Sequence, residues 1–198
     1  MLEYLKTYRD IALIYKKLFT EFDHMCSLDV LDLYREYLKL SVKLGTNSPV
    51  FDEKFGKYAH CNCYCYALGI TAPYEFVKRY EYKEIDDLSH NLGFMDDRFR
   101  YSLDLDMNLS GLQSDLELLG IDSYETTMLH EPSHNGYKIA FFKAYDDFHF
   151  IRQNSDGSWS HKLGYTPKIE RIEMPQERVL GRYNYVKTLE IVKPVIRK

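Results

Sequence analysis

The sequence lacks an apolar run long enough to cross a bilayer, and its first residues do not resemble a secretory leader. The opening segment, MLEYLKTYRD, carries charges at Glu3, Lys6 and Arg9, where a leader needs unbroken apolar residues. A membrane-spanning helix requires about 20 consecutive apolar residues. We therefore expect a soluble protein without a membrane partner, cytoplasmic or delivered without a cleavable signal peptide.

An excess of basic charge is also missing. The chain has 26 Lys and Arg residues against 30 Asp and Glu, a formal net charge of -4. General nucleic-acid binders concentrate Lys and Arg against the phosphate backbone. We therefore expect no nucleic-acid partner.

Cysteines are few, and their spacing is poor for disulfides. Three of the four, Cys61, Cys63 and Cys65, lie within five residues, and the fourth is Cys26. Such crowding favours thiols kept reduced over disulfide bridges. His60 and the three clustered cysteines could bind zinc, but structural zinc sites add a second, distant ligand pair that the sequence lacks. We expect no metal and no cofactor, with a zinc site as the alternative.

The first part of the chain has helical periodicity. Residues 2–22 place apolar side chains three and four positions apart, and a second helix is expected from the N-cap Ser27 to Gly45. Residues 1–45 then form a helical hairpin, packed on its own domain or docking a partner. The expected buried stripe of the first helix consists of Leu5, Tyr8, Ala12, Tyr15, Phe19 and Phe22.

Three shorter helices follow in the prediction. One covers residues 63–68 and stops at Gly69, and another runs from Thr71 to about Asp87. The third, LSGLQSDLELLGI, has Ser110 near its start and Gly120 at its end.

After Gly136 the pattern changes to strands. YKIAFFKAY, FHFIRQ and SWSHK are expected to be strands, with NSDG as the hairpin turn between the second and third. TPKIERIEM and VKTLEIVKPV are expected to complete an antiparallel sheet. Helices followed by strands predict an α+β fold in which N-terminal helices pack with an antiparallel sheet, residues 46–198 forming the second domain.

Cys63 has the position of a reactive thiol among the three clustered cysteines. It begins the helix predicted at residues 63–68, where the helix dipole and backbone amides stabilise a thiolate and an oxyanion. Asn62, just before it, is expected to be a cap or a polar wall. Cys65 is rotated by about 200° from Cys63 and cannot share its task. The alternative for each cysteine is a small buried hydrophobic residue.

A nucleophilic cysteine needs a base and a group that orients the base. His149 and His161 lie on two strands joined by the NSDG turn, and a turn centred near Asp156 predicts residue 149 opposite residue 161 or 162. The two imidazoles are then expected to touch. The alternative is two unrelated histidines on a sheet edge. Of the other histidines considered, His24 and His90 are expected on the surface and His130 and His134 in a loop.

These segments resemble papain-like cysteine peptidases, in which a cysteine begins a helix and a histidine lies on a following sheet. The spacing of the two histidines, with Asp156 and Gly157 between them, is similar to the NlpC-type branch. NCYCYALG and DFHFIRQNSDGSWSHKLGYTP resemble uncharacterised bacterial papain-like proteins with NCYxYA and DYHWYRQ…WSHKPG motifs. Leu163 stands where those motifs have proline.

The resemblance implies a papain-like fold with Cys63 as nucleophile, His149 as general base and His161 as the orienting residue. It implies a cysteine hydrolase, a thiol protease or amidase acting on an amide or peptide bond of a peptide or protein substrate. Candidates for oxyanion or substrate positioning are Asn62, Tyr64 and Trp159, and residues 47–58 are a further source of an oxyanion donor. An acyltransferase, a glutamine deamidase and a non-catalytic interaction module remain alternatives. The sequence does not predict the oligomeric state.

Overall fold

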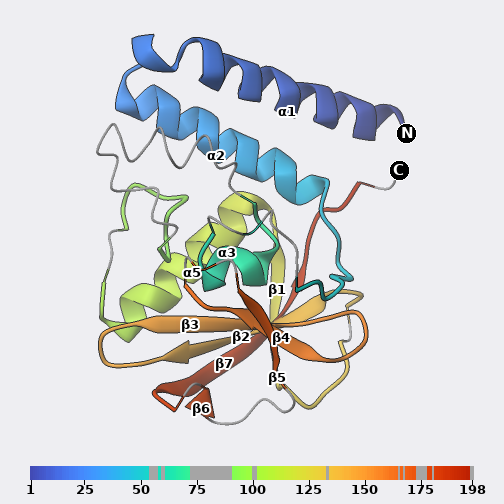
Figure 1. Ribbon diagram of the computed structural model, residues 1–198, viewed down its shortest axis with the longest axis vertical. Coiled ribbons are helices and arrows are strands. Elements are labelled where there is room, and N and C mark those ends of the chain that lie inside the picture. The colour runs from blue at the N-terminus through green and yellow to red at the C-terminus, as the bar shows by residue number, and fades with distance from the viewer. Residues whose placement is uncertain are drawn as a thin grey trace.

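Two long helices lie above a sheet in the computed structural model, and shorter helices lie between this helix pair and the sheet (Figure 1). The hairpin consists of α1 (Leu2–Thr20), a 3-10 turn (Phe22–His24) and α2 (Ser27–Lys43). α2 lies between α1 and the rest of the molecule (Figure 1). The described residues are 1–53, 58, 61–71, 91–99, 102–132, 134–164, 166, 168–172, 178–179 and 181–196.

The predicted buried stripe of α1 is wrong in its first half. Leu5 and Tyr8 are 56% and 61% exposed, whereas Thr7 and Leu18 are buried. The helix carries apolar residues on two adjacent stripes, and only packing against α2 selects one. The N-cap of α2 is Cys26, one residue before the predicted cap Ser27, because the Cys26 sulfur accepts the Asp29 amide hydrogen bond.

The shorter helices are α3 (Cys63–Leu68) and α5 (Leu105–Leu119). The prediction for α3 is confirmed at both ends. α5 begins before Ser110, because the Asp104 carboxylate accepts the Met107 amide hydrogen bond and caps the helix there. The helix predicted from Thr71 lies outside the described residues beyond Thr71 itself.

Seven strands of the described part form one antiparallel sheet. The strand order is β1-β7-β2-β3-β4-β5, with β6 paired to β7. The predicted α+β order of helices followed by an antiparallel sheet is confirmed, whereas β1 and β6 were not predicted. The strands are β1 (Asp122–Thr126), β2 (Tyr137–Lys143), β3 (Phe148–Gln153), β4 (Trp159–Lys162), β5 (Ile169–Ile172), β6 (Arg178–Val179) and β7 (Tyr183–Val192).

The central strands are buried on both faces of the sheet. Side chains of β3 alternate, so that Phe148 and Phe150 join the core beneath α3 while Ile151 joins a second cluster on the other face. The first core also contains Leu18 of α1 and Tyr34 of α2. The helical hairpin therefore shares a hydrophobic core with the sheet, and the domain boundary at residue 45 stays a prediction. Among the described residues, no helix combines the length and apolar character needed to span a membrane.

Candidate active site

Local sequence places Cys63 at the first turn of α3. The Asn62 side-chain oxygen accepts a hydrogen bond from the Cys65 amide at 3.0 Å, so Asn62 is the N-cap. At the other end Gly69 adopts a left-handed conformation with φ 64°, and the Ile70 amide bonds the Cys65 carbonyl at 2.9 Å. Only six residues separate these two signals, and Cys63 is the first of them.

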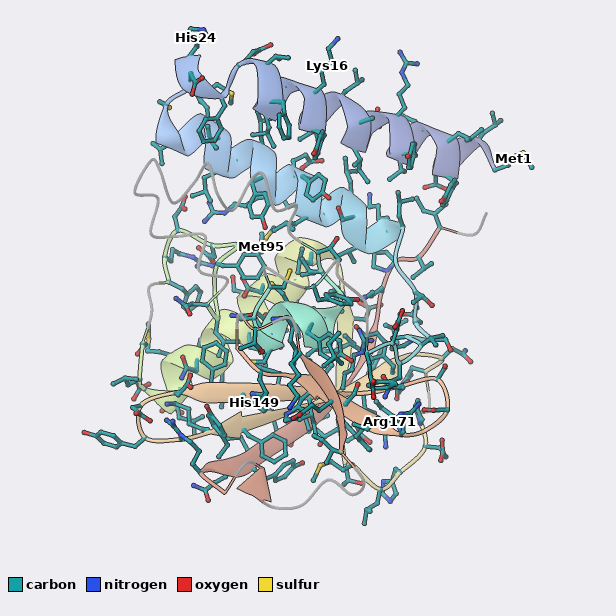
Figure 2. All side chains as sticks on the ribbon, viewed as in Figure 1. Met1, Lys16, His24, Met95, His149 and Arg171 are labelled. Atoms are coloured by element: carbon teal, nitrogen blue, oxygen red, sulfur yellow. The ribbon has the colours of Figure 1, made fainter. Side chains whose placement is uncertain are left out.

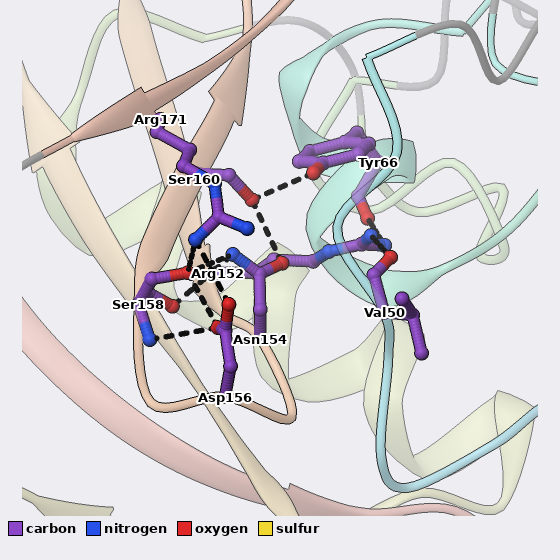
Figure 3. Close-up of polar contacts among 8 residues, drawn as sticks. All are labelled: Val50, Tyr66, Arg152, Asn154, Asp156, Ser158, Ser160 and Arg171. Carbon is purple, nitrogen blue, oxygen red and sulfur yellow. Dashed lines mark hydrogen bonds and ion pairs between the residues drawn. The ribbon is translucent and has the colours of Figure 1, made fainter.

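Polar contacts from the strands hold α3 against the sheet. The Arg152 guanidinium of β3 donates to the Tyr66 carbonyl at 3.2 Å and to the Val50 carbonyl at 3.3 Å, as Figure 3 shows. The Tyr66 hydroxyl pairs with the Ser160 hydroxyl of β4 at 2.7 Å. Ser160 in turn donates to the Asn154 side chain at 3.0 Å. α3 is therefore fixed to both strands that carry the candidate histidines.

The Cys63 thiol lies beside the backbone of β3. Its sulfur is 4.0 Å from the Phe148 carbonyl oxygen, and the Phe150 amide also interacts with it. A carbonyl at one position and the amide two positions later point to the same edge of a strand. The β3–β4 pairing covers only residues 151–153, so this edge is not paired with β4 at Phe148–Phe150. The thiol is thus adjacent to the peptide segment centred on His149.

Burial dominates the electrostatics of Cys63. The side chain is only 5% exposed, and loss of hydration raises the pKa of the thiol to about 12. The amides of Phe150 and Tyr64 and the Lys162 ammonium lower this pKa, whereas Asp147 raises it. The resting thiol is therefore neutral, and cationic and amide groups that would stabilise a thiolate are close by.

Lys162 is a site residue that sequence reasoning missed. Its side chain is fully buried and donates hydrogen bonds to the Cys61 carbonyl and, at 2.7 Å, to the Gly164 carbonyl. Burial lowers the pKa of this lysine, and the clustered cysteines oppose that shift. The signal available in the sequence was the lysine directly after His161 in the SWSHK segment. Its burial, which the structure shows, gives that position weight, since a lysine is seldom fully buried unless it is paired.

His149 and His161 are brought into direct contact. Their Nε2 and Nδ1 atoms lie 2.8 Å apart, with the rings nearly perpendicular. The predicted register, with residue 149 opposite residue 161 or 162, was wrong by one or two residues, because His161 pairs with Ile151. The hairpin is centred on Asp156, so that His149 lies diagonally from His161 on the same face. The long imidazole side chains bridge this diagonal.

Both histidines are buried and neutral. Burial, followed by the neighbouring His161, lowers the pKa of His149 to about 3. Burial also lowers the pKa of His161, although Glu170 opposes that shift. His149 lies among the strands, at the opposite end of the molecule from Met1 and Lys16 (Figure 2). Its ring also contacts Tyr183, whose hydroxyl donates to Asp147 at 2.7 Å.

The remaining candidate positions have the contacts of packed residues. Tyr64 is fully buried, and its hydroxyl donates to Asp115 at 3.0 Å. Trp159 on β4 belongs to the cluster on the His149 face, which also contains Ile151. The oxygen of Asn62 is engaged by the helix cap. Oxyanion or substrate positioning by these three residues stays a prediction.

None of the four cysteines forms a disulfide, as expected, and Cys61 and Cys65 are buried whereas Cys26 is exposed. His60, on which the zinc alternative depended, lies outside the described residues together with His90. In the described ranges no group of three or more His, Cys, Asp or Glu side chains is arranged to hold a metal ion. His24 is exposed, as predicted.

The structure thus joins the two histidines and places the thiol beside the backbone next to His149. Within the described part of the chain, no hydrogen bond links Cys63 directly to the His149 ring. Comparisons with protein-family models, curated proteins and solved structures found no match for this chain.

Proposed function

We propose that the protein is a papain-like cysteine hydrolase that cleaves an amide or peptide bond of a peptide or protein substrate. One observation carries the proposal. His149 uses Nε2 to contact His161, and its other ring nitrogen, Nδ1, has no hydrogen-bond partner among the described residues. The Cys63 sulfur lies beside the same peptide segment of β3. A base oriented through one nitrogen and open at the other is what thiol catalysis requires.

In the proposed reaction the Cys63 proton passes to His149 Nδ1, and the thiolate attacks the substrate carbonyl. The negative charge on the tetrahedral intermediate is stabilised by the Cys63 backbone amide at the start of α3. His149 then gives its proton to the leaving amine as the C–N bond breaks, which leaves an acyl group on the sulfur. A water molecule, deprotonated by His149, attacks this thioester and releases the acid and the thiol.

Proton transfer within the pair does not require either charge to be buried alone. Burial opposes each isolated ion, which is why the thiol pKa is about 12 and the imidazole pKa about 3. A thiolate and an imidazolium formed together have no net charge, and they attract each other strongly in a medium of low dielectric constant. The Lys162 ammonium adds a further favourable interaction with the sulfur anion.

The same residues support transfer or deamidation. The acyl-enzyme is released by whichever nucleophile reaches it, so that an amine would give acyl transfer instead of hydrolysis. If the substrate amide were a glutamine side chain, the leaving group would be ammonia. The chemistry at Cys63 and His149 would be identical in all three reactions.

A non-catalytic interaction module is the second candidate, and the burial of Cys63 favours it. A thiol that is 5% exposed with a raised pKa also matches a cysteine that only fills the core. This candidate predicts no selective reactivity at Cys63.

Labelling with a cysteine-directed acyl-type activity probe tests the proposal. We expect purified protein to be labelled, and Cys63→Ala to abolish labelling. Cys61→Ala and Cys65→Ala are matched controls, because both cysteines are equally buried neighbours in the same segment, and both should retain it. Loss of labelling in Cys61→Ala equal to that in Cys63→Ala would contradict the assignment.

A second measurement separates the enzyme from the interaction module. Near pH 6, alkylation of the native protein should be faster at Cys63 than at Cys61 or Cys65, because His149 can accept the thiol proton, and it should slow in His149→Gln. Slow alkylation of all buried cysteines at the same rate would instead support the interaction module.

A further inference from the structure

Three polar side chains lie in a row across three neighbouring strands. Glu170 of β5 is directly opposite His161 of β4, and His161 contacts His149 of β3 across the diagonal. The His161 Nε2 atom is 3.5 Å from the Glu170 Oε2 atom, and the His149 Nε2 atom is 2.8 Å from His161 Nδ1. Glu170 therefore extends the contact between the two histidines that the sequence analysis had identified.

The carboxylate at the end of this row determines where the imidazole protons lie. Glu170 is ionised at neutral pH, as an ordinary glutamate is, and its ion pair with Lys168 lowers the pKa of the carboxyl group further. A carboxylate only accepts, so His161 is stabilised with its single proton on Nε2. The Nδ1 atom of neutral His161 is then an acceptor, and only a protonated Nε2 of His149 can donate to it.

The consequence at His149 is chemically specific. A neutral imidazole carries one N–H, and here that N–H is used toward His161. The Nδ1 atom of His149 is therefore unprotonated and can accept a proton. The opposite tautomer would present an N–H at Nδ1, which cannot accept a proton from a thiol.

We propose that Glu170 is a positioning residue that fixes the tautomers of His161 and His149, so that His149 presents a bare Nδ1 as its catalytic base. The catalytic consequence rests on the proposed hydrolase function, whereas the tautomers themselves do not. In the described ranges, polar groups near the pair include Tyr183, which contacts the His149 ring, and Asp147, which accepts the Tyr183 hydrogen bond. The Lys168 ammonium, paired with Glu170, acts on His161 through its charge. Neither Tyr183 nor Asp147 hydrogen-bonds a ring nitrogen of the pair.

Long-range ¹H–¹⁵N correlation spectra of histidine-labelled protein test the proposal, because they distinguish protonated from bare ring nitrogens. In the wild type at neutral pH, both histidines should carry the proton on Nε2. Glu170→Ala should move both toward a mixture of tautomers. Glu170→Asp, which keeps a carboxylate, should restore part of the wild-type pattern.

Lys168→Ala is the matched control. It removes the ion pair of Glu170 but leaves the carboxylate beside His161, so it should preserve the wild-type tautomers. A wild-type spectrum with His149 protonated at Nδ1 would overturn the proposal even if no variant folded. Unchanged tautomers in folded Glu170→Ala would overturn it equally.

The probe-labelling rate separates this proposal from the function itself. If both are correct, Glu170→Ala should slow labelling of Cys63 by about two-fold or more, because the competent tautomer is no longer the only one populated. Absent labelling in a wild type with the expected tautomers would reject the hydrolase alone. If Cys63 is labelled but Glu170→Ala leaves the tautomers of both histidines unchanged, the positioning role alone would be rejected.

Discussion

At the scale of single residues, the candidate site consists of ionisable groups that burial keeps neutral. Cys63, His149 and His161 are each at most 5% exposed. Desolvation moves the thiol pKa upward and the imidazole pKa values downward, because in each case it disfavours the charged form. Such shifts link the protonation of the site to the stability of the fold.

The buried histidines make the protein sensitive to acid. An unfolded His149 takes up a proton as the pH falls through about 6.5, whereas the folded protein resists until about pH 3. The unfolded state thus binds more protons between these values. The stabilisation is complete above pH 6.5 and is lost progressively as the pH falls toward 3. His161 acts in the same direction.

We predict that His149→Gln weakens the pH dependence of the unfolding free energy between pH 6.5 and 5. The slope should decrease by about 1 kcal/mol per pH unit, as expected for one buried histidine. Urea unfolding at several pH values measures this slope. Burial raises the pKa of Asp115 to about 7, so this carboxyl group stabilises the folded state as the pH falls and opposes the effect of the histidines. It does so equally in the wild type and in His149→Gln. The matched control His24→Gln, at an exposed histidine, should keep the wild-type slope; an unchanged slope in His149→Gln would contradict the prediction.

At the scale of elements, the position of β2 depends on how closely its start approaches β7. A side-chain carbon at Gly136 would lie 2.2 Å from the Ile191 carbonyl oxygen of β7. The Gly136 amide also donates to Glu190 on the same strand at 3.2 Å. Glycine is therefore required here by close packing of two backbones. β2 in turn pairs with β3, which carries His149.

We predict that Gly136→Ala destabilises the protein by about 1–3 kcal/mol, because the backbone of β7 must move to admit the methyl group. Gly157 in the β3–β4 turn provides the control. It has φ +80° with no atom within 4 Å of an added carbon, so that its substitution costs only backbone strain. Asparagine tolerates that conformation, so Gly157→Asn should be milder than Gly157→Ala, whereas Gly136→Asn should be at least as harmful as Gly136→Ala. Chemical unfolding compares the four variants, and a Gly136→Ala protein as stable as the wild type would refute the steric argument.

At the scale of the whole molecule, a buried carboxylate connects α5 to α3 and to the segment at residues 91–99. Asp115 is fully buried and accepts hydrogen bonds from the Gly93 amide at 2.7 Å and the Met95 amide at 2.8 Å. It also accepts the Tyr64 hydroxyl bond from α3. The helix that carries Cys63 is therefore held by hydrogen bonds to Asp115 of α5 and to Arg152 of β3.

We predict that Asp115→Ala lowers the unfolding free energy by about 3 kcal/mol or more, because it leaves two buried amides without an acceptor. Tyr64→Phe removes only one of these bonds and should cost about 1 kcal/mol. Glu117→Ala, at an exposed position of the same helix, is the control and should change stability by less than about 0.5 kcal/mol. Denaturant unfolding measures all three. Equal losses for Asp115→Ala and Tyr64→Phe would show that the amides find other partners.

What the sequence determined by itself was encoded locally. The α+β order, the start of α3 at Cys63 and the hairpin that brings together His149 and His161 follow from a cap, a helix-ending glycine, alternating strands and a turn. Each of these signals depends on a few neighbouring residues, so it favours the same local structure independently of how distant parts of the chain pack. The two histidines were found for the same reason.

Only the tertiary structure decided the rest. The diagonal register of the histidines, the buried face of α1, and the placement of Lys162 and Glu170 beside the site depend on which distant elements pack together. Glu170 carries no local motif, and Lys162 lies in the SWSHK segment with no role assigned to its side chain; the pairing of β4 with β5 brings both to the site. Burial by the assembled core also sets the neutral states of Cys63 and His149, because desolvation arises only when α3 and the sheet enclose them.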